Sequence, residues 1–291
     1  MITPELLAQV RRLTIRSRRA VEEVFAGAYR SAFRGKGLEF SEVREYVAGD
    51  DVRTIDWNVT ARHGRPFVKR FDEERELTVV LALDLSGSLR FGSTARTKRN
   101  TAAEAGALLA LAASRNRDRV GLLLFTDRVE LYLPPSKSRA RSLRIVRDLV
   151  AFEPRGTGTD LHGALAFLGR VLRRRAVLFL ISDWFAESFD RPLNLLARRH
   201  EIVAVEVQDP LEEDLPARGL IQVRDLETGV TRTVNLGSAG ARREWRGTRA
   251  RRQRVLKEVL TRARADRIRV TCGSPVAPEL VRHFEQRAFR R

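Results

Sequence analysis

Residues 77–88 read LTVVLALDLSGS, and this stretch decides the fold class of the chain. Its first seven residues form an apolar run that is rich in valine and leucine and too short for a helix of ordinary length. Strands that are covered on both faces of a sheet have this composition. The run ends in Asp84, after which Ser86 and Ser88 alternate along the loop, so one carboxylate and two hydroxyls can face the same side.

Runs of the same kind recur along the chain, at residues 120–125 (VGLLLF), 176–181 (AVLFLI) and 202–207 (IVAVEV). Amphipathic, helix-forming stretches lie between them, at residues 101–114, 138–152, 160–173 and 189–199. Strands that alternate with helices predict right-handed crossovers and parallel pairing. Residues 129–133 follow a strand too closely for a crossover and predict a short antiparallel edge strand. The sequence therefore predicts an α/β fold: a three-layer, Rossmann-like sandwich with a mainly parallel sheet.

The flanking segments carry different patterns. Residues 4–26 predict one or two helices, and residues 34–76 are glycine-rich and charge-dense with short strands. Towards the other end, the patterns predict a hairpin at 220–236, a long basic helix at 242–265, a last strand at 268–272 and a closing helix at 277–288. We expect an N-terminal elaboration over residues 1–76 and a main domain over residues 77–291, with the hairpin and basic helix inserted near 219–265.

The composition is strongly basic. Lys and Arg number 55 against 37 Asp and Glu, giving a formal net charge of +18 over 291 residues, and only five of the basic residues are lysines. The last 51 residues hold +11 of this charge, so carboxylate- or phosphate-bearing partners are expected. The single cysteine, Cys272, excludes an intramolecular disulfide and a thiolate-built zinc site. Without a long apolar run or a signal-peptide core, the chain is expected to be soluble and cytoplasmic.

Oxygen-bearing side chains follow two of the predicted strands and one loop. Asp84 ends the first strand, Asp183 follows the strand at 176–181, and Thr159 stands in a Gly-Thr-Gly-Thr-Asp loop before a helix that Asp160 can cap. If the two strands are neighbours, both aspartates overhang one crevice at the carboxyl edge of the sheet. Hard oxygen ligands suit Mg²⁺ or Mn²⁺. The Asp-x-Ser-x-Ser string by itself equally fits an ordinary turn.

Asp84, Ser86, Ser88, Thr159 and Asp183 resemble, in residue type, order and strand context, the metal-ion-dependent adhesion site of von Willebrand factor type A domains. The resemblance covers about residues 77–210. It implies that the serines and the threonine coordinate one Mg²⁺ (or Mn²⁺ or Ca²⁺) per chain, while the aspartates act directly or through water. It also implies that an acidic residue of a protein partner completes the shell. Leu89, where many relatives have methionine, is not a ligand.

A second resemblance covers most of the chain. It is carried by residues 35–40, Arg44, Glu45, Tyr46, Gly49, Asp50, Asp51, Arg53, Asp56, Trp57, Ala61, Arg62 and Glu74. These look like the signature of the bacterial family called domain of unknown function fifty-eight, whose members are von Willebrand type A proteins often associated with MoxR-type AAA+ ATPases. The resemblance implies an adaptor or co-factor of such an ATPase in the assembly or activation of a client.

Other interpretations stay open. The arginine-rich C-terminal region also fits a nucleic-acid-binding protein or a metal-dependent nuclease. Asp50, Asp51 and Asp56, near Arg53 and Arg62, fit a structural ion-pair cluster or a second metal centre. Trp57, Trp184 and Phe185 could form an exposed aromatic rim for a partner, although Trp57 fits core packing equally well. With scattered histidines, no Gly-x-Ser-x-Gly motif and no P-loop, we expect no catalytic residues and no enzymatic activity.

Overall fold

The computed structural model describes residues 4–21, 25–33, 39–72, 76–213, 215 and 219–289. Its elements, in chain order, are α1 (Pro4–Ala20), α2 (Ala26–Ala32), β1 (Glu39–Glu45), η2 (Val52–Thr54), α3 (Trp57–His63), β2 (Phe67–Asp72), β3 (Thr78–Asp84), η3 (Gly87–Arg90), α4 (Lys98–Arg115), β4 (Arg119–Phe125), β5 (Val129–Ser136), α5 (Arg139–Ala151), α6 (Leu161–Val171), β6 (Val177–Ser182), α7 (Asp190–Ala197), β7 (Glu201–Gln208), α8 (Pro210–Glu213), β8 (Leu220–Arg224), β9 (Thr231–Asn235), α9 (Ala239–Arg262), β10 (Asp266–Thr271) and α10 (Val276–Phe289).

A six-stranded sheet in the order β10-β7-β6-β3-β4-β5 forms the centre of the molecule. Its pairs are parallel except β4–β5, where β5 runs antiparallel along the edge. The predicted mainly parallel α/β fold is therefore confirmed. The strand order reverses between β3 and β6, because the chain moves from β3 to β4 on one side and from β6 to β7 on the other. In open α/β sheets this switch point is where ligands bind.

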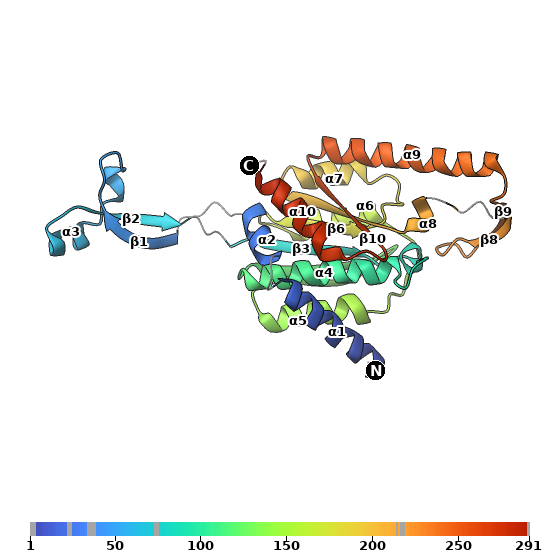
Figure 1. The fold of residues 1–291 in the computed structure, drawn as a ribbon, viewed down its shortest axis with the longest axis horizontal. Helices are drawn as coiled ribbons and strands as arrows, with labels where there is room; N and C mark the ends of the chain where they lie inside the picture. Colours follow the sequence, from blue (N-terminus) through green and yellow to red (C-terminus); the bar gives the residue numbers. More distant parts are fainter. Residues whose placement is uncertain are drawn as a thin grey trace.

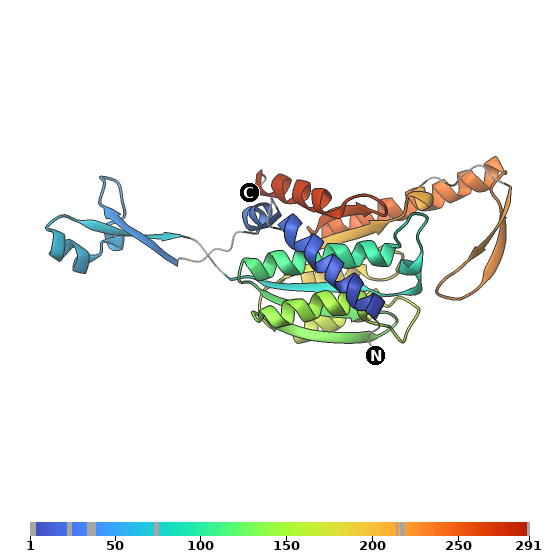
Figure 2. The same ribbon diagram turned by 60° about the horizontal axis from the view of Figure 1, so that its bottom comes forward.

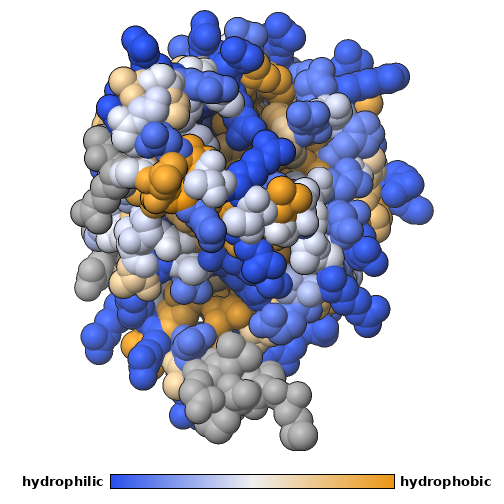
Figure 3. Space-filling model, turned by 90° about the vertical axis from the view of Figure 1, so that its right-hand side faces the viewer, coloured by the Kyte–Doolittle hydropathy of each residue, from blue (hydrophilic) through white to orange (hydrophobic). Residues whose placement is uncertain are grey.

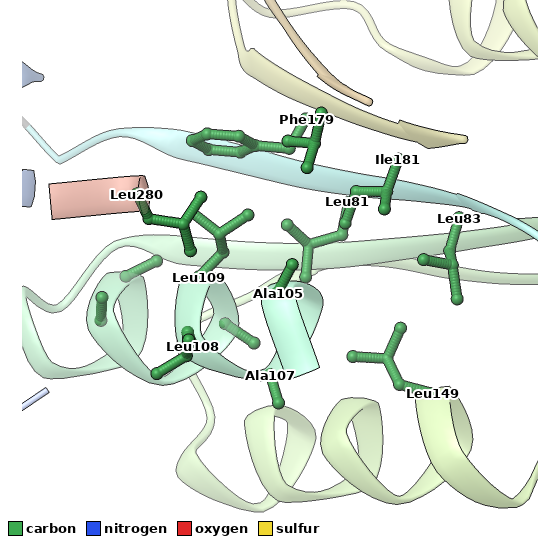
Figure 4. Close-up of a cluster of buried hydrophobic side chains, with 14 of the residues drawn as sticks. Leu81, Leu83, Ala105, Ala107, Leu108, Leu109, Leu149, Phe179, Ile181 and Leu280 are labelled. Atoms are coloured by element: carbon green, nitrogen blue, oxygen red, sulfur yellow. The ribbon is translucent and has the colours of Figure 1, made fainter. Parts of the chain in front are cut away.

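Two apolar layers enclose the sheet, and β3 shows why its sequence is apolar at every position. Val79, Leu81 and Leu83 point into one core cluster, built with α4, α5 and α10. Val80 and Ala82 point into the other, built with α6, α7 and α9. Figure 4 shows Leu81 and Leu83 facing side chains of α4 and α5 in the first layer. The helices thus cover both faces of the sheet, as Figure 1 shows.

The two N-terminal helices take part in the first of these layers. Phe25, Tyr29 and Phe33, in and beside α2, place their rings 5.5, 5.9 and 5.3 Å from the ring of Phe284 on α10. Helix α1 crosses α4, as Figure 2 shows. Helices α1 and α2 therefore pack directly against the core that surrounds the central sheet, and the division of the chain at residue 76 stays a prediction.

The β1–β2 hairpin with α3 extends away from the sheet in Figure 1. It carries the acidic cluster of the sequence, and each aspartate has a structural role. Asp50 accepts two bonds from Arg44, at 2.9 and 2.6 Å, while Asp51 caps η2 and Asp56 caps α3. The ion-pair interpretation thus holds for Asp50, with Arg44 in place of the expected Arg53 or Arg62. Residues 35–38 and Glu74 of the family signature lie outside the described residues.

At the other end, α9 and the β8–β9 hairpin project beyond the sheet (Figures 1 and 2). Strands β8 and β9 pair antiparallel, at the predicted hairpin position. None of the described helices combines the length and apolar character needed to cross a membrane.

Candidate metal centre

The carboxyl ends of β3 and β6 bring the predicted residues to one edge of the sheet. The two strands are parallel neighbours, with Leu83 opposite Ile181, so Asp84 and Asp183 leave the sheet at the same level. This is the switch point of the strand order, and both carboxylates lie at one edge of the sheet, as the sequence predicts. Figure 3 looks onto this end of the molecule, whose surface is largely hydrophilic with small apolar groups between.

Asp84 is fully buried and held by two donors. Its Oδ1 accepts from the Ser86 backbone N–H at 2.8 Å, and its Oδ2 accepts from the Ser182 hydroxyl at 2.8 Å. Burial, followed by the charge of neighbouring Asp183, raises the pKa of Asp84 to about 7. Ser86 Oγ lies 3.1 Å from Ser88 Oγ, so the alternating side chains face one side, as expected.

Thr159 comes from the loop before α6. Asp160 caps this helix, since its Oδ1 accepts from the Gly163 N–H at 2.8 Å. The loop lies against the β3 loop, where the Gly87 N–H donates to the Thr157 carbonyl at 2.7 Å. Gly156 must be glycine in this packing, because a Cβ there would lie 2.0 Å from Asp127 Oδ1. These contacts carry Thr159 to the edge where Asp84 and Asp183 lie.

A buried lysine, Lys98, forms an ion pair with Asp183. Lys98 Nζ, at the first turn of α4, donates to Asp183 Oδ2 at 2.7 Å and to Glu212 Oε1 at 2.6 Å. The Lys98 side chain is 1% exposed. Burial alone would lower the pKa of Lys98, but the charges of Asp183 and Glu212 outweigh it and raise that pKa. Lys98 therefore stays an ammonium and balances one carboxylate of the site.

Trp184, which follows Asp183, does not form the exposed rim that the sequence suggests. It is 6% exposed and packs edge-on against Phe189, with ring centroids 5.5 Å apart. Its φ of 61° lies in the left-handed region, a costly conformation for a bulky side chain. Phe185 is the exposed member of the pair, at 40%, and lies beneath Lys98 and Arg252. Trp57, at 69%, is exposed on α3.

Glu227, from the turn of the β8–β9 hairpin, also reaches the site. Its Oε1 accepts from the Thr159 hydroxyl at 2.8 Å, and its carboxylate also bonds to the Ser88 side chain. Burial raises the pKa of Glu227, and the nearby charges of Asp183 and Asp225 add to this effect. One carboxylate thus links two of the hydroxyls predicted as ligands.

The donor set fits a hard cation. Two carboxylates and three hydroxyls supply oxygens, the ligands that Mg²⁺, Mn²⁺ and Ca²⁺ prefer. Within the described ranges, no group of three or more His, Cys, Asp or Glu side chains is placed to hold a metal ion. A cation at this edge would therefore depend on Ser86, Ser88 and Thr159 as well as on Asp84 and Asp183.

Comparison with known proteins shows the family to which the chain belongs. The model of the family described as protein of unknown function DUF58 matches residues 42–255. The chain belongs to the DUF58 family. It is 34% identical over 239 residues to the uncharacterized protein Rv1480 of Mycobacterium tuberculosis, covering 81% of this chain and 75% of that protein. It is 37% identical over 106 residues to the uncharacterized protein MAV169 of Mycobacterium avium, covering 35% and 63%.

Two solved structures share the fold of this DUF58 protein. The conserved hypothetical protein BatB of Bacteroides thetaiotaomicron has a TM-score of 0.50 at 16% identity, covering 73% of this chain and 99% of that one. An aerotolerance-related membrane protein of Bacteroides fragilis has a TM-score of 0.51 at 15% identity, covering 74% and 100%. At this identity the likeness concerns the fold alone.

Three polar residues of the site in this DUF58 chain were not predicted from the sequence: Lys98, Glu212 and Glu227. Lys98 and Glu212 lie 114 residues apart, and only the packing of α8 beside the start of α4 brings them together. Glu227 reads in the sequence as an ordinary turn residue. The single signal in the sequence is the position of Lys98, one of five lysines, directly after the helix cap Thr97.

Proposed function

We propose that this DUF58 protein is a metal-ion-dependent protein-binding module and not an enzyme. Asp84, Ser86, Ser88, Thr159 and Asp183 would hold one Mg²⁺, with Mn²⁺ or Ca²⁺ as alternatives. The bound cation would supply an electrophilic centre for a carboxylate of the partner. The observation that carries the proposal is that Thr159 and Ser88 already hold a carboxylate, that of Glu227, at the switch point of the sheet.

The chemistry of the site favours capture over hydrolysis. Hydrolytic centres activate water with a cation and commonly place a base beside it. Here the Asp84 carboxylate is occupied by the Ser86 N–H and Ser182, while Asp183 is occupied by Lys98 and the Phe185 N–H. Both acids are assigned as ligands of the cation and as partners of these donors, which leaves neither of them as a base for water. A carboxylate-bearing partner needs no base.

The expected partner is a MoxR-type AAA+ ATPase or its client, on the strength of the family resemblance. The arginines of α9 and β10 would assist an acidic partner by long-range attraction. Several of them are already used inside the chain: Arg249 pairs with Glu213, and Arg267 pairs with buried Glu206. These internal pairs reduce the number of arginines that a nucleic-acid-binding surface could offer to phosphates.

Partner binding should depend on the metal. The immobilised chain is used to recover proteins from a bacterial lysate in Mg²⁺, and the proteins that EDTA releases are identified. Surface plasmon resonance then gives the dissociation constant of the purified partner. We expect EDTA, or Thr159→Ala in Mg²⁺, to weaken binding at least about tenfold, which corresponds to roughly 1.4 kcal/mol.

Thr261→Ala provides the matched control, because it removes an exposed hydroxyl on α9. This variant should bind like the unaltered chain. Equal dissociation constants in Mg²⁺ and EDTA for a folded, unaltered chain would show that recognition uses another surface.

A further inference from the structure

The tip of the β8–β9 hairpin lies directly on the candidate metal centre. A Cβ added to Gly87, in the loop after β3, would lie 2.2 Å from the carbonyl oxygen of Leu226, so the backbone of this loop packs directly against the backbone of the hairpin. Thr157 donates to the Glu227 carbonyl at 3.4 Å, and Thr159 donates to the Glu227 carboxylate at 2.8 Å. The tip therefore contacts both loops that supply the hydroxyl ligands.

The turn is built to present Glu227. Asp225 Oδ1 accepts from the backbone N–H groups of Glu227 and Thr228, at 2.9 and 3.2 Å. Gly229 then takes a φ of +75°, which closes the turn and which other residues rarely adopt. With its backbone fixed in this way, the side chain of Glu227 is left to reach the site.

The rest of the hairpin has little to hold it down. Leu220 is 74% exposed, Val223 43% and Val230 50%. A two-stranded hairpin without an apolar face is marginally stable in water. Its base is anchored, because the Leu236 side chain is buried and the Leu236 carbonyl accepts from Arg242 on α9. The tip can therefore leave the site while the base stays attached to the fold.

We propose that Glu227 is a built-in ligand of the metal centre, and that a partner binds by displacing it with a carboxylate of its own. This inference rests on the proposed function and deepens it by naming how the site is regulated. A cation held by Asp183 and Thr159 would attract the Glu227 carboxylate, which already contacts the Thr159 hydroxyl. A bound cation would therefore hold the hairpin closed, and a partner carboxylate that outcompetes Glu227 would open it.

The test uses Mn²⁺ and acetate as probes on the full chain. Mn²⁺ affinity is measured by calorimetry, and access of acetate by the relaxation of its carbon-13 carboxyl signal in the Mn²⁺-loaded protein. Hydrogen exchange of the amides in residues 220–236 reports closure of the hairpin. Glu227→Gln is compared with Glu244→Gln, which changes an exposed glutamate on α9.

Three results are expected. Glu227→Gln binds Mn²⁺ about tenfold more weakly, because it loses one charged ligand. The carboxyl signal of acetate relaxes faster with Mn²⁺-loaded Glu227→Gln than with the Mn²⁺-loaded unaltered chain, because a coordination position is open. Mn²⁺ slows exchange in residues 220–236 of the unaltered chain and of Glu244→Gln, and has no such effect in Glu227→Gln.

Failure of this inference can be distinguished from failure of the proposed function. Suppose the unaltered chain binds Mn²⁺ and Glu227→Gln matches it in Mn²⁺ affinity, acetate access and hydrogen exchange. Then the assignment of Glu227 as a ligand is wrong, and the proposed metal centre is unaffected. If the unaltered chain binds no Mn²⁺, both proposals are wrong.

Discussion

Lys98 shows how charge is balanced at the candidate site. Its ammonium lies between Asp183 and Glu212 and is almost completely buried. A buried ion pair adds little stability relative to apolar residues, but removing one partner leaves the other charge without compensation. The main role of Lys98 is therefore to compensate the charges of the two acids, and the ion pairs themselves add little net stability.

We predict that Lys98→Met lowers the free energy of unfolding by about 3–5 kcal/mol, because Asp183 and Glu212 then stay buried without a cation. Urea denaturation in EDTA measures the change. Lys257→Met, which alters an exposed lysine on α9, should stay within about 0.5 kcal/mol of the unaltered chain. A loss below about 1 kcal/mol for Lys98→Met would mean that the two acids find another partner.

At the level of single residues, the sequence predicts one part of the site well and misses another. Asp84 and Asp183 were predictable because each ends an apolar strand, and parallel strands end at one edge. Lys98 and Glu227 meet partners 85 and 68 residues away, through the docking of α4 and of the hairpin. No local pattern records such docking. For the same reason Trp184 was misplaced, since its burial depends on Phe189 and a left-handed backbone.

Among the elements, α2 and α10 form a single aromatic cluster although they lie at opposite ends of the chain. Phe284 is fully buried, with its ring 6.4 Å from that of Phe179 on β6 and close to three rings in and beside α2. The cluster joins α2 to the sheet. The helical period predicted α10, at residues 277–288, but the predicted N-terminal helices end at residue 26, where α2 begins, and nothing in the sequence predicted that α2 and α10 meet.

We predict that Phe284→Ala lowers the free energy of unfolding by about 3–5 kcal/mol, the usual cost of emptying a large aromatic site in a core. Phe289→Ala is the matched control, since Phe289 lies on the same helix and is 92% exposed. Chemical denaturation followed by circular dichroism gives both values. A small loss for Phe284→Ala, or equal losses for the two variants, would show that α2 and α10 are not part of the central core.

Across the whole molecule, the sequence predicted the architecture because β3, β4, β6 and β7 are apolar on both faces and alternate with helices. The observed strands differ from the predicted runs by only a residue or two at each end. The net charge of the sequence did not indicate which groups the arginines contact. Arg249, Arg267 and Arg287 all pair with acids of the same chain, and composition cannot distinguish such internal pairs from a binding surface.

Asp84 gives the central claim its sharpest test, because its carboxylate is buried beside Asp183 at a cost to the fold. Asparagine can keep both of its contacts: its oxygen can accept from the Ser86 N–H, and its amide can donate to Ser182. We therefore expect Asp84→Asn to fold with a free energy of unfolding in EDTA that is equal to or higher than that of the unaltered chain.

The measurement is calorimetric titration of Mn²⁺ into the unaltered chain and into Asp84→Asn, with urea denaturation of both in EDTA. Our account predicts about one Mn²⁺ per unaltered chain, no measurable binding to Asp84→Asn, and no loss of stability in the variant. Equal Mn²⁺ affinity in the two folded proteins, or no binding to the unaltered chain, would contradict the assignment of this edge of the sheet as a metal centre.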